Sequence, residues 1–263
     1  MLQRLADRVF SWTTAEPSTS RPGVTYARTG FAATIAATAV GGGVVLIDPP
    51  ALTEEQCSRL ERLGAPTHVL LTCEWHTRRA AWCRDRWNCQ VLMHAAGVPR
   101  AEIPIDGVLE DGALLWDAVR VVHLPDVYYP EEVALLVECA RPAPFLIVGD
   151  ALSGGREDQG IPDGEVALHA PRYVADFAKA HASLRRLLDF RFDGIGFGHG
   201  TSIPSSGRAA VERCLRSEVA WLASGGREGS LDHVARWRPA MLIERYRGAA
   251  AERARGVPAL PYN

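Results

Sequence analysis

Lysine is nearly absent from this chain of 263 residues, because Lys179 is the one lysine among 29 basic residues. Basic residues do not outnumber acidic ones, 29 against 31, and the net charge is -2. Without a basic excess to neutralise phosphates, the composition argues against a dedicated nucleic-acid binder. Hydrophobic residues make up 47% and charged residues 23%, which is outside the disordered range. Length and composition therefore predict one large folded domain.

Several motifs of common enzyme classes are also missing. There is no G-x-S-x-G nucleophile elbow and no Walker motif, and the run Gly196 to Gly200 is too short for a dinucleotide fingerprint. The 6 cysteines are scattered and form no C-x-x-C pair, which is typical of reduced thiols in a cytosolic protein.

No segment has the pattern of a leader or a membrane span. The first twelve residues carry Arg4, Asp7 and Arg8 and lack an apolar signal-peptide core. The longest uncharged stretch, 29–47, is interrupted by consecutive glycines and favours two strands over a transmembrane helix. We therefore expect a cytoplasmic protein that has no membrane partner.

The order of elements predicts a layered fold. Thr53 and Gln56 form a capping box for a helix that ends at Gly64. Strands are expected at 34–40, 44–47, 68–71, 90–94, 109–116, 119–123, 133–139, 145–148 and 194–197, and further helices at 77–88, 174–190, 208–223 and 233–247. Helices outside mixed strands indicate an α/β or α+β architecture. Residues 1–263 are expected to form a single domain, with 1–24 an irregular lead-in and 224–263 a helical C-terminal extension.

Polar residues gather where the predicted strands end, which is where layered folds usually bind ligands. Asp48 ends the first buried strand, Cys73 to Arg78 follow the second, and Asp150 and His199 each end an apolar strand. A buried carboxylate has to be paired or coordinated, although Asp48 alone could cap a turn and His76 alone could be a packed histidine.

Four of these segments, in this order, resemble the metallo-β-lactamase superfamily. They are residues 44–48, 67–72, 145–152 and 183–200, and the resemblance covers about residues 25 to 220. It implies a four-layer αββα sandwich with the site at one edge of the two sheets. The superfamily's metal loop, T-H-x-H-x-D-H, supplies three histidines and an aspartate to two zinc ions.

The ligand positions implied by the resemblance are mostly replaced here. When the loop is laid on Thr72, its ligand positions hold Cys73, Trp75, Thr77 and Arg78. The histidine of the next motif, P-G-H-T-P-G, becomes Val127. Only Asp150 and His199 remain.

Two interpretations stay open, and the sequence favours the first. In the first, no metal binds, and the guanidinium of Arg78 replaces the ion by pairing with Asp150 or by binding a small anionic ligand. His76, His199 and Tyr128 would complete that ligand site. The loop of this chain resembles that of a branch of the superfamily, which reads like T-N-R-H-H-x-R and has no established activity.

In the second interpretation, Cys73, His76, Asp150 and His199 hold one zinc ion in a rebuilt mononuclear hydrolase. His76, Asp150 and His199 are its candidate catalytic residues. A dinuclear zinc hydrolase is least favoured, because Arg78 would place a positive charge where the second cation would lie. Like charges about 4 Å apart repel by roughly 4 kcal/mol at an effective dielectric near 20. Less favoured alternatives are a Cys73 nucleophile with His76 as its base, and a purely structural role. The expected partner is a small molecule, and a homodimer stays open.

Overall fold

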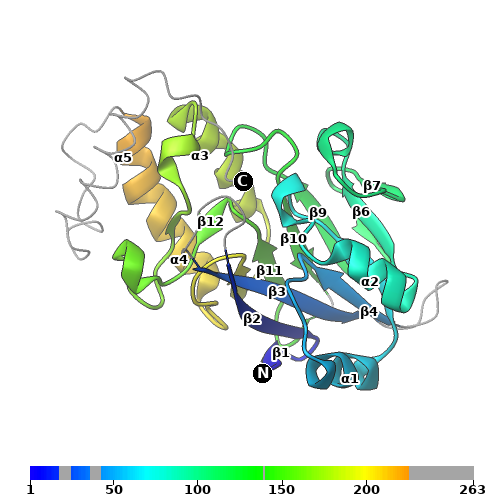
Figure 1. The fold of residues 1–263 in the computed structure, drawn as a ribbon. Helices are drawn as coiled ribbons and strands as arrows, with labels where there is room; N and C mark the ends of the chain where they lie inside the picture. Colours follow the sequence, from blue (N-terminus) through cyan, green and yellow to red (C-terminus); the bar gives the residue numbers. More distant parts are fainter. Residues whose placement is uncertain (18–24, 36–42, 139, 225–263) are drawn as a thin grey trace.

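The computed structural model describes residues 1–17, 25–35, 43–138 and 140–224. Two β-sheets lie at its centre (Figure 1). The first sheet has 7 strands in the order of the chain: β1 (Gln3–Ala6), β2 (Val9–Pro17), β3 (Thr25–Ile35), β4 (Gly43–Ile47), β5 (Pro66–Leu70), β6 (Gln90–His94) and β7 (Gly107–Leu109). Its first four strands are antiparallel and β4 to β7 are parallel.

The second sheet has 5 strands in the order β14 (Gly194–Phe197), β11 (Phe145–Val148), β10 (Val133–Val137), β9 (Val119–His123) and β8 (Leu114–Leu115). Its strands are antiparallel except for β11 and β14, which run parallel. A separate two-stranded ribbon pairs β12 (Leu152–Ser153) with β13 (Ala167–Leu168).

Helices cover the outer face of each sheet. The helices α1 (Glu54–Leu63) and α2 (Ala80–Trp87) lie against the first sheet, and α3 (Phe177–Arg185), α4 (Gly207–Cys214) and α5 (Ala220–Ala223) lie at the second (Figure 1). A π-helical turn, Leu215–Val219, joins α4 to α5. Short 3-10 helices are Glu74–His76, Val98–Arg100, Glu157–Gln159, Pro171–Tyr173 and Arg186–Asp189.

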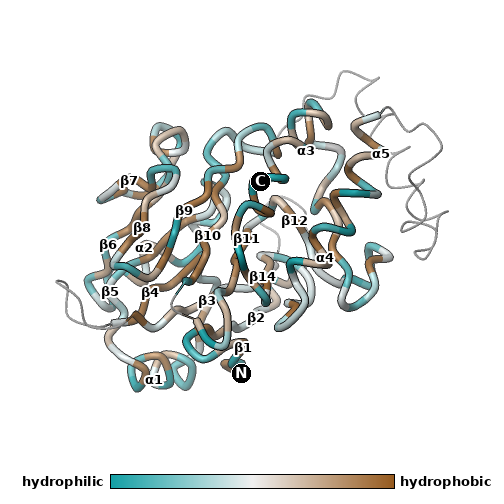
Figure 2. The backbone as a smooth tube through the Cα atoms, turned by 180° about the vertical axis from the view of Figure 1, so that it is seen from behind, coloured by the Kyte–Doolittle hydropathy of each residue, from teal (hydrophilic) through white to brown (hydrophobic). Residues whose placement is uncertain are grey.

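Alternation along the strands explains the layers. In β4, Val45 and Ile47 pack with the second sheet, whereas Val44 and Leu46 pack with α1 and α2. Because successive side chains of a strand point to opposite faces, a continuous apolar run indicates a strand covered on both sides. Figure 2 shows such hydrophobic tracts along the central strands. The expected αββα sandwich is confirmed.

Several element predictions are confirmed. The Thr53–Gln56 capping box is present at the start of α1, and Gly64 ends that helix. The strands β6, β9, β11 and β14 have the predicted bounds. Within the described ranges, no helix is long and apolar enough to cross a membrane. The 5 cysteines in these ranges are buried and form no disulfide bond with one another: Cys57, Cys73, Cys83, Cys89 and Cys214.

The prediction of an irregular lead-in is wrong for residues 3–17, which form β1 and β2. β2 pairs along its whole length with β3, and its Val9 and Trp12 are buried in the apolar clusters on opposite faces of the sheet. The predicted helix 174–190 is shorter, since α3 continues as a 3-10 turn, and the predicted strand 109–116 is divided between β7 and β8. Most of the predicted C-terminal extension, including helix 233–247, lies outside the described residues.

Candidate metal centre

The site forms where the carboxyl ends of four strands meet. β4 and β5 are parallel in the first sheet and lead into Asp48 and Thr72; β11 and β14 are parallel in the second and lead into Asp150 and His199. Two backbone hydrogen bonds join the sheets here: Val133 N donates to the Thr72 carbonyl (2.9 Å), and Thr29 N to the Gly198 carbonyl (3.1 Å). The sheet ends therefore hold these residues on one rigid edge.

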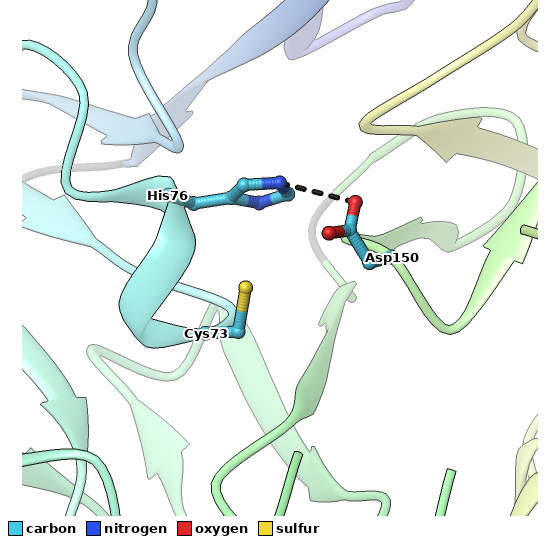
Figure 3. A group of neighbouring side chains, drawn as sticks. All are labelled: Cys73, His76 and Asp150. Carbon is cyan, nitrogen blue, oxygen red and sulfur yellow. Dashed lines mark ion pairs between the residues drawn. The ribbon is translucent and has the colours of Figure 1, made fainter. Parts of the chain in front are cut away.

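A short 3-10 turn after β5 carries Cys73 and His76. His76 N donates to the Cys73 carbonyl (3.2 Å), which brings both side chains to the same side of the turn (Figure 3). The buried Asp48 carboxylate accepts hydrogen bonds from Thr72 N (2.9 Å), Thr72 Oγ1 (2.6 Å) and His76 Nδ1 (2.8 Å). Since Nδ1 bonds to Asp48, the other ring nitrogen of His76 is the one that faces the site.

His76 Nε2 lies 3.1 Å from Asp150 Oδ1 (Figure 3). His199 Nε2 approaches the same oxygen to 3.4 Å. Neither contact has the geometry of a hydrogen bond to Asp150 Oδ1. Atoms at these distances can form an ion pair with each other when the imidazole is protonated, or can ligate a third atom with their lone pairs when it is neutral.

The backbone around Asp150 is fixed by a second acid. Glu132 Oε1 accepts hydrogen bonds from Asp150 N (2.9 Å) and Ala151 N (2.7 Å), while Glu132 Oε2 is buried without a hydrogen-bond partner. Gly149 allows the close approach, because a Cβ there would lie 2.1 Å from Thr72 Oγ1. The sequence did not indicate a role for Glu132 in the site, because this residue directly precedes a strand and no motif surrounds it.

His199 is oriented in the same way as His76. Its Nδ1 lies 3.2 Å from the carbonyl oxygen of Ala27, so an Nδ1 proton would leave Nε2 free to face Asp150. Ligating histidines commonly donate their second nitrogen to a carboxylate or a backbone carbonyl in this way. Both histidines therefore present a ring nitrogen to the same carboxylate.

His169 is a further donor that the sequence analysis missed. Its ring stacks on His199 with centroids 4.4 Å apart and an interplanar angle of 18°. No motif surrounds it, and the pairing of Leu152 with Leu168 in the β12–β13 ribbon helps to bring it beside Asp150. This contact depends on a pairing between two-residue strands, which no local pattern reveals.

Arg78 does not pair with Asp150, so that expectation is wrong. Its Nη1 donates to the carbonyls of Thr29 (3.0 Å) and Asp48 (3.1 Å), and its Nε is buried without a hydrogen-bond partner. The backbone at Arg78 is left-handed, with a φ of 34°. The guanidinium is therefore anchored by one nitrogen and remains beside the acids without bonding to them.

Tyr128 lies at the same edge, where its hydroxyl oxygen accepts a hydrogen bond from Ala170 N (2.9 Å). That bond fixes the backbone next to His169. Val127, which the resemblance places at a ligand histidine's position, is buried in the apolar cluster between the second sheet and its helices. The structure thus gives Tyr128 a positioning contact, and leaves position 127 in the core.

The site is crowded with acids, and this shifts its pKa values. Burial and the carboxylates of Asp150 and Glu132 raise the pKa of Cys73 far above its ordinary value. Burial and Arg78 lower the pKa of His76, but Asp150 and Asp48 outweigh them and leave it raised. Burial alone would raise the pKa of Asp150, yet the surrounding imidazoles hold it well below its usual range.

The donors fall into two groups that share Asp150. The ligand atoms of Cys73, His76 and Asp150 lie within 4.8 Å of one another, and so do those of Asp150, His169 and His199. The four-residue zinc site expected from the sequence is therefore divided, because no single group contains both Cys73 and His199. Tetrahedral zinc donors with bonds of about 2.0–2.1 Å lie roughly 3.3 Å apart, close to the spacings at Asp150 Oδ1. The residues present fit a metal ion.

Together, these features define a four-layer α/β sandwich whose donor atoms gather at one sheet edge. A family model described as "Metallo-beta-lactamase superfamily" matches residues 30–217, and the chain belongs to that superfamily. No curated protein matches the chain.

Among solved structures, VMB-1 at pH 5.5 superposes with a TM-score of 0.62 at 10% identity, covering 85% of this chain and 97% of its own. The metallo-β-lactamase FIM-1 from Pseudomonas aeruginosa in its mono-zinc form has a TM-score of 0.59 at 11% identity, covering 86% and 95%. A di-iron-bound form of TTHA1623 has a TM-score of 0.50 at 23% identity, covering 74% and 96%. These likenesses concern the fold.

Proposed function

We propose that this chain is a metal-dependent hydrolase whose metal ion is held by Cys73, His76 and Asp150. The observation that carries the proposal is the orientation of His76. Its Nδ1 bonds to the buried Asp48 carboxylate, and its Nε2 faces Asp150 Oδ1 without hydrogen-bond geometry. This is the carboxylate–histidine arrangement that prepares an imidazole to ligate a metal.

The charge around these donors supports the same conclusion. Cys73, Asp48, Glu132 and Asp150 are buried acids in mutual electrostatic contact, and Arg78 is the fixed positive charge beside them. Buried acids without enough positive charge are costly unless they are protonated or coordinated. A divalent cation would offset the excess, and a thiolate, an imidazole and a carboxylate suit zinc.

A bound ion would supply Lewis acidity and a water of lowered pKa for the attack on an ester, thioester or phosphoester. The protein's own contribution is to fix the donors: Asp48 holds His76, and Glu132 holds the backbone at Asp150. FIM-1, which shares the fold, is described in a mono-zinc form.

Arg78 favours substrates that carry an anionic group. With Nη1 bonded to two carbonyls, its Nε lacks a hydrogen-bond partner, and the guanidinium has no ion pair with the described acids. A planar guanidinium binds carboxylates and phosphates through two parallel hydrogen bonds. We therefore place the anionic end of the substrate at Arg78.

The test of the metal is elemental analysis of the full-length chain as purified, alongside Cys73→Ala and His76→Ala. The matched control is Cys57→Ala, which removes a buried thiol on α1 away from the site. We expect metal in the wild type and the control, and its loss from both site variants. A wild-type chain that is metal-free and cannot be loaded with zinc would overturn the proposal.

The test of the substrate uses two chromogenic esters that differ only in one carboxylate. Hydrogen bonds to a charged group contribute about 1.5–3 kcal/mol, so Arg78→Gln should raise KM for the anionic ester roughly 10- to 100-fold. KM for the neutral ester should change little. Equal changes for both esters would show that Arg78 does not read the charge.

The second candidate function is metal-free binding of an anionic small molecule through Arg78, with His76, His199 and Tyr128 around it. The observation that favours it is the raised pKa of His76 between Asp48 and Asp150, because an imidazolium there could replace the cation. It predicts that inorganic phosphate or a small dicarboxylate stabilises the metal-free chain against heat, and that Arg78→Gln abolishes this effect.

A further inference from the structure

Two consecutive acids contact both segments that carry the proposed metal donors. Glu131 and Glu132 directly precede β10, and both are fully buried. Glu132 bonds to the backbone at Asp150, whereas Glu131 Oε1 accepts a hydrogen bond from Glu74 N (3.3 Å). Glu74 begins the 3-10 turn Glu74–His76 after β5. Glu131 therefore holds the donor-bearing turn of the first sheet, as Glu132 holds the donor-bearing loop of the second.

The hydrogen bond to Glu131 acts on the peptide that directly follows Cys73. The N–H of this peptide, at Glu74, donates to Glu131 Oε1, and its carbonyl, at Cys73, accepts a hydrogen bond from His76 N (3.2 Å). Both polar groups of the peptide are thus bonded, which constrains the direction of the Cys73 side chain. Because Cys73 and His76 are two of the three proposed donors, Glu131 acts on the metal centre through this turn.

Arg100 joins Glu131 to the same turn from the surface. Its Nη2 forms an ion pair with Glu131 Oε2 (2.6 Å), and its Nε bonds to the carboxylate of Glu74. The side chain of Glu131 is 0% exposed and that of Arg100 is 45% exposed, so a surface arginine neutralises a buried acid. A planar guanidinium that bonds to two carboxylates through different nitrogens fixes their relative positions, which a point charge does not.

The short helix Val98–Arg100 is packed tightly against Glu131. A Cβ at Gly97, the residue before this helix, would lie 2.8 Å from Glu131 Cγ and 2.7 Å from the sulfur of Met93. Arg100 N donates to the Gly97 carbonyl (3.0 Å), so the helix begins at this close contact. The backbone of Arg100 is therefore held beside the acid with which its side chain pairs.

We propose that Arg100 and Glu131 are positioning residues of the metal centre, because they hold the turn Glu74–His76 beside Asp150. The inference rests on the proposed function, whose ion is its readout. Both residues act through the backbone and the side chain of Glu74 and do not ligate the ion. Neither lies at a ligand position that the resemblance to the superfamily implies. Outer-shell partners that orient ligands typically change metal affinity about 10- to 100-fold.

The charge of Arg100 makes the direction of the effect diagnostic. If Arg100 acted only through its charge, its removal would strengthen the binding of a cation, because like charges repel. A positioning role predicts weaker binding, since the turn loses the contact that fixes it. The matched control for a general loss of stability is Arg84→Met. Arg84 Nη2 bonds to Asp106 Oδ2 (2.5 Å) and to the Pro104 carbonyl (2.6 Å), which joins α2 to the segment before β7.

The experiment is a Co²⁺ titration of the full-length chain after chelation, for the wild type, Arg100→Met, Arg100→Lys and Arg84→Met. Equilibrium dialysis measures the affinity, and the cobalt–thiolate charge-transfer band reports whether Cys73 ligates the ion. Circular dichroism and thermal unfolding measure folding and stability. Arg100→Lys keeps a positive charge beside the buried Glu131, but its ammonium lacks the planar fork that bonds to two carboxylates.

We expect Arg100→Met to weaken Co²⁺ binding roughly 10- to 100-fold and to reduce the thiolate band, and Arg100→Lys to weaken binding by a smaller factor. Arg84→Met should bind Co²⁺ like the wild type even if its Tm falls.

Where Arg100→Met folds, unchanged or tighter binding in that variant refutes the inference; where it does not fold, the same result in Arg100→Lys refutes it. An equal loss of affinity in Arg84→Met also refutes it, because stability alone would then explain the effect. Each of these results leaves the proposed function standing. A wild type that binds no Co²⁺ refutes both proposals.

Discussion

Replacing Asp48 with Asn tests whether this carboxylate orients the site. Asp48 accepts three hydrogen bonds, from Thr72 N, Thr72 Oγ1 and His76 Nδ1, in a position that is 1% exposed. Asn keeps one acceptor oxygen and places an NH₂ group against His76 Nδ1. Because two donors cannot face each other, the imidazole has to move its proton to Nε2, the nitrogen that faces Asp150.

The expected cost follows from these bonds. Hydrogen bonds to a charged group contribute about 1.5–3 kcal/mol each, and Asn can partly replace two of the three, so we expect a loss of about 2–4 kcal/mol in the metal-free chain. For a chain of this size that lowers Tm by roughly 5–15 °C. Protonation of Nε2 removes the lone pair that would bind the metal, so zinc affinity should fall at least 10- to 100-fold.

Thermal unfolding and zinc titration of the chelated chain measure both effects. The control is Asp158→Asn, an exposed acid paired with Arg156, which should change stability by less than about 1 kcal/mol. If Asp48→Asn changes stability no more than the control, or leaves zinc affinity unchanged, then Asp48 does not orient His76 and the reasoning fails.

Gly149→Ala should cost about 1–3 kcal/mol in urea unfolding, because its Cβ would meet Thr72 Oγ1 at 2.1 Å; a neutral effect would contradict the tight packing. Burial, and after it the charge of His123, lowers the pKa of His94 from 6.5. As the pH drops through 6.5, His94 therefore gains its proton in the unfolded chain before it does in the folded chain, and the free energy of unfolding decreases. His94→Gln should reduce the loss of unfolding free energy between about pH 7.5 and 5.5, and an equal loss in both proteins would refute this. Val127→His, which buries a polar ring in an apolar cluster, should cost about 2–4 kcal/mol without adding metal; an additional bound ion would show that position 127 faces the site.

Strands that are buried on both faces could be predicted because their signal is local. Phe145–Val148 and Gly194–Phe197 are apolar runs between turn residues, and each is buried on both faces. The strands β1 and β2 were not predicted because they mix Arg, Ser and Thr with the buried Val9 and Trp12. The conformation of β2 depends on its pairing with β3, which is a long-range interaction, and β1 in turn pairs with β2.

The candidate site was predictable only in part, for a related reason. Asp48, Cys73, His76, Asp150 and His199 follow strands, and the order of parallel strands brings them to one edge. Local sequence does not encode the partner of each side chain. Arg78 was expected to pair with Asp150 or to bind an anionic ligand, but its Nη1 donates to the carbonyls of Thr29 and Asp48.

Motif positions and spatial positions give different accounts of this site. By motif position, the resemblance implies that most of the superfamily's ligands are replaced, and Val127, which the motif lays on a histidine position, is buried in the core. In space, the 3-10 turn supplies Cys73 and His76 beside Asp150, and the β12–β13 ribbon supplies His169 beside His199. A metal responds to the direction and charge of the donor atoms and not to their order in the chain. Asp48 orients His76 and the Ala27 carbonyl orients His199, so that both histidines face Asp150. These oriented donors are therefore a better guide to the chemistry of the site than the missing motif.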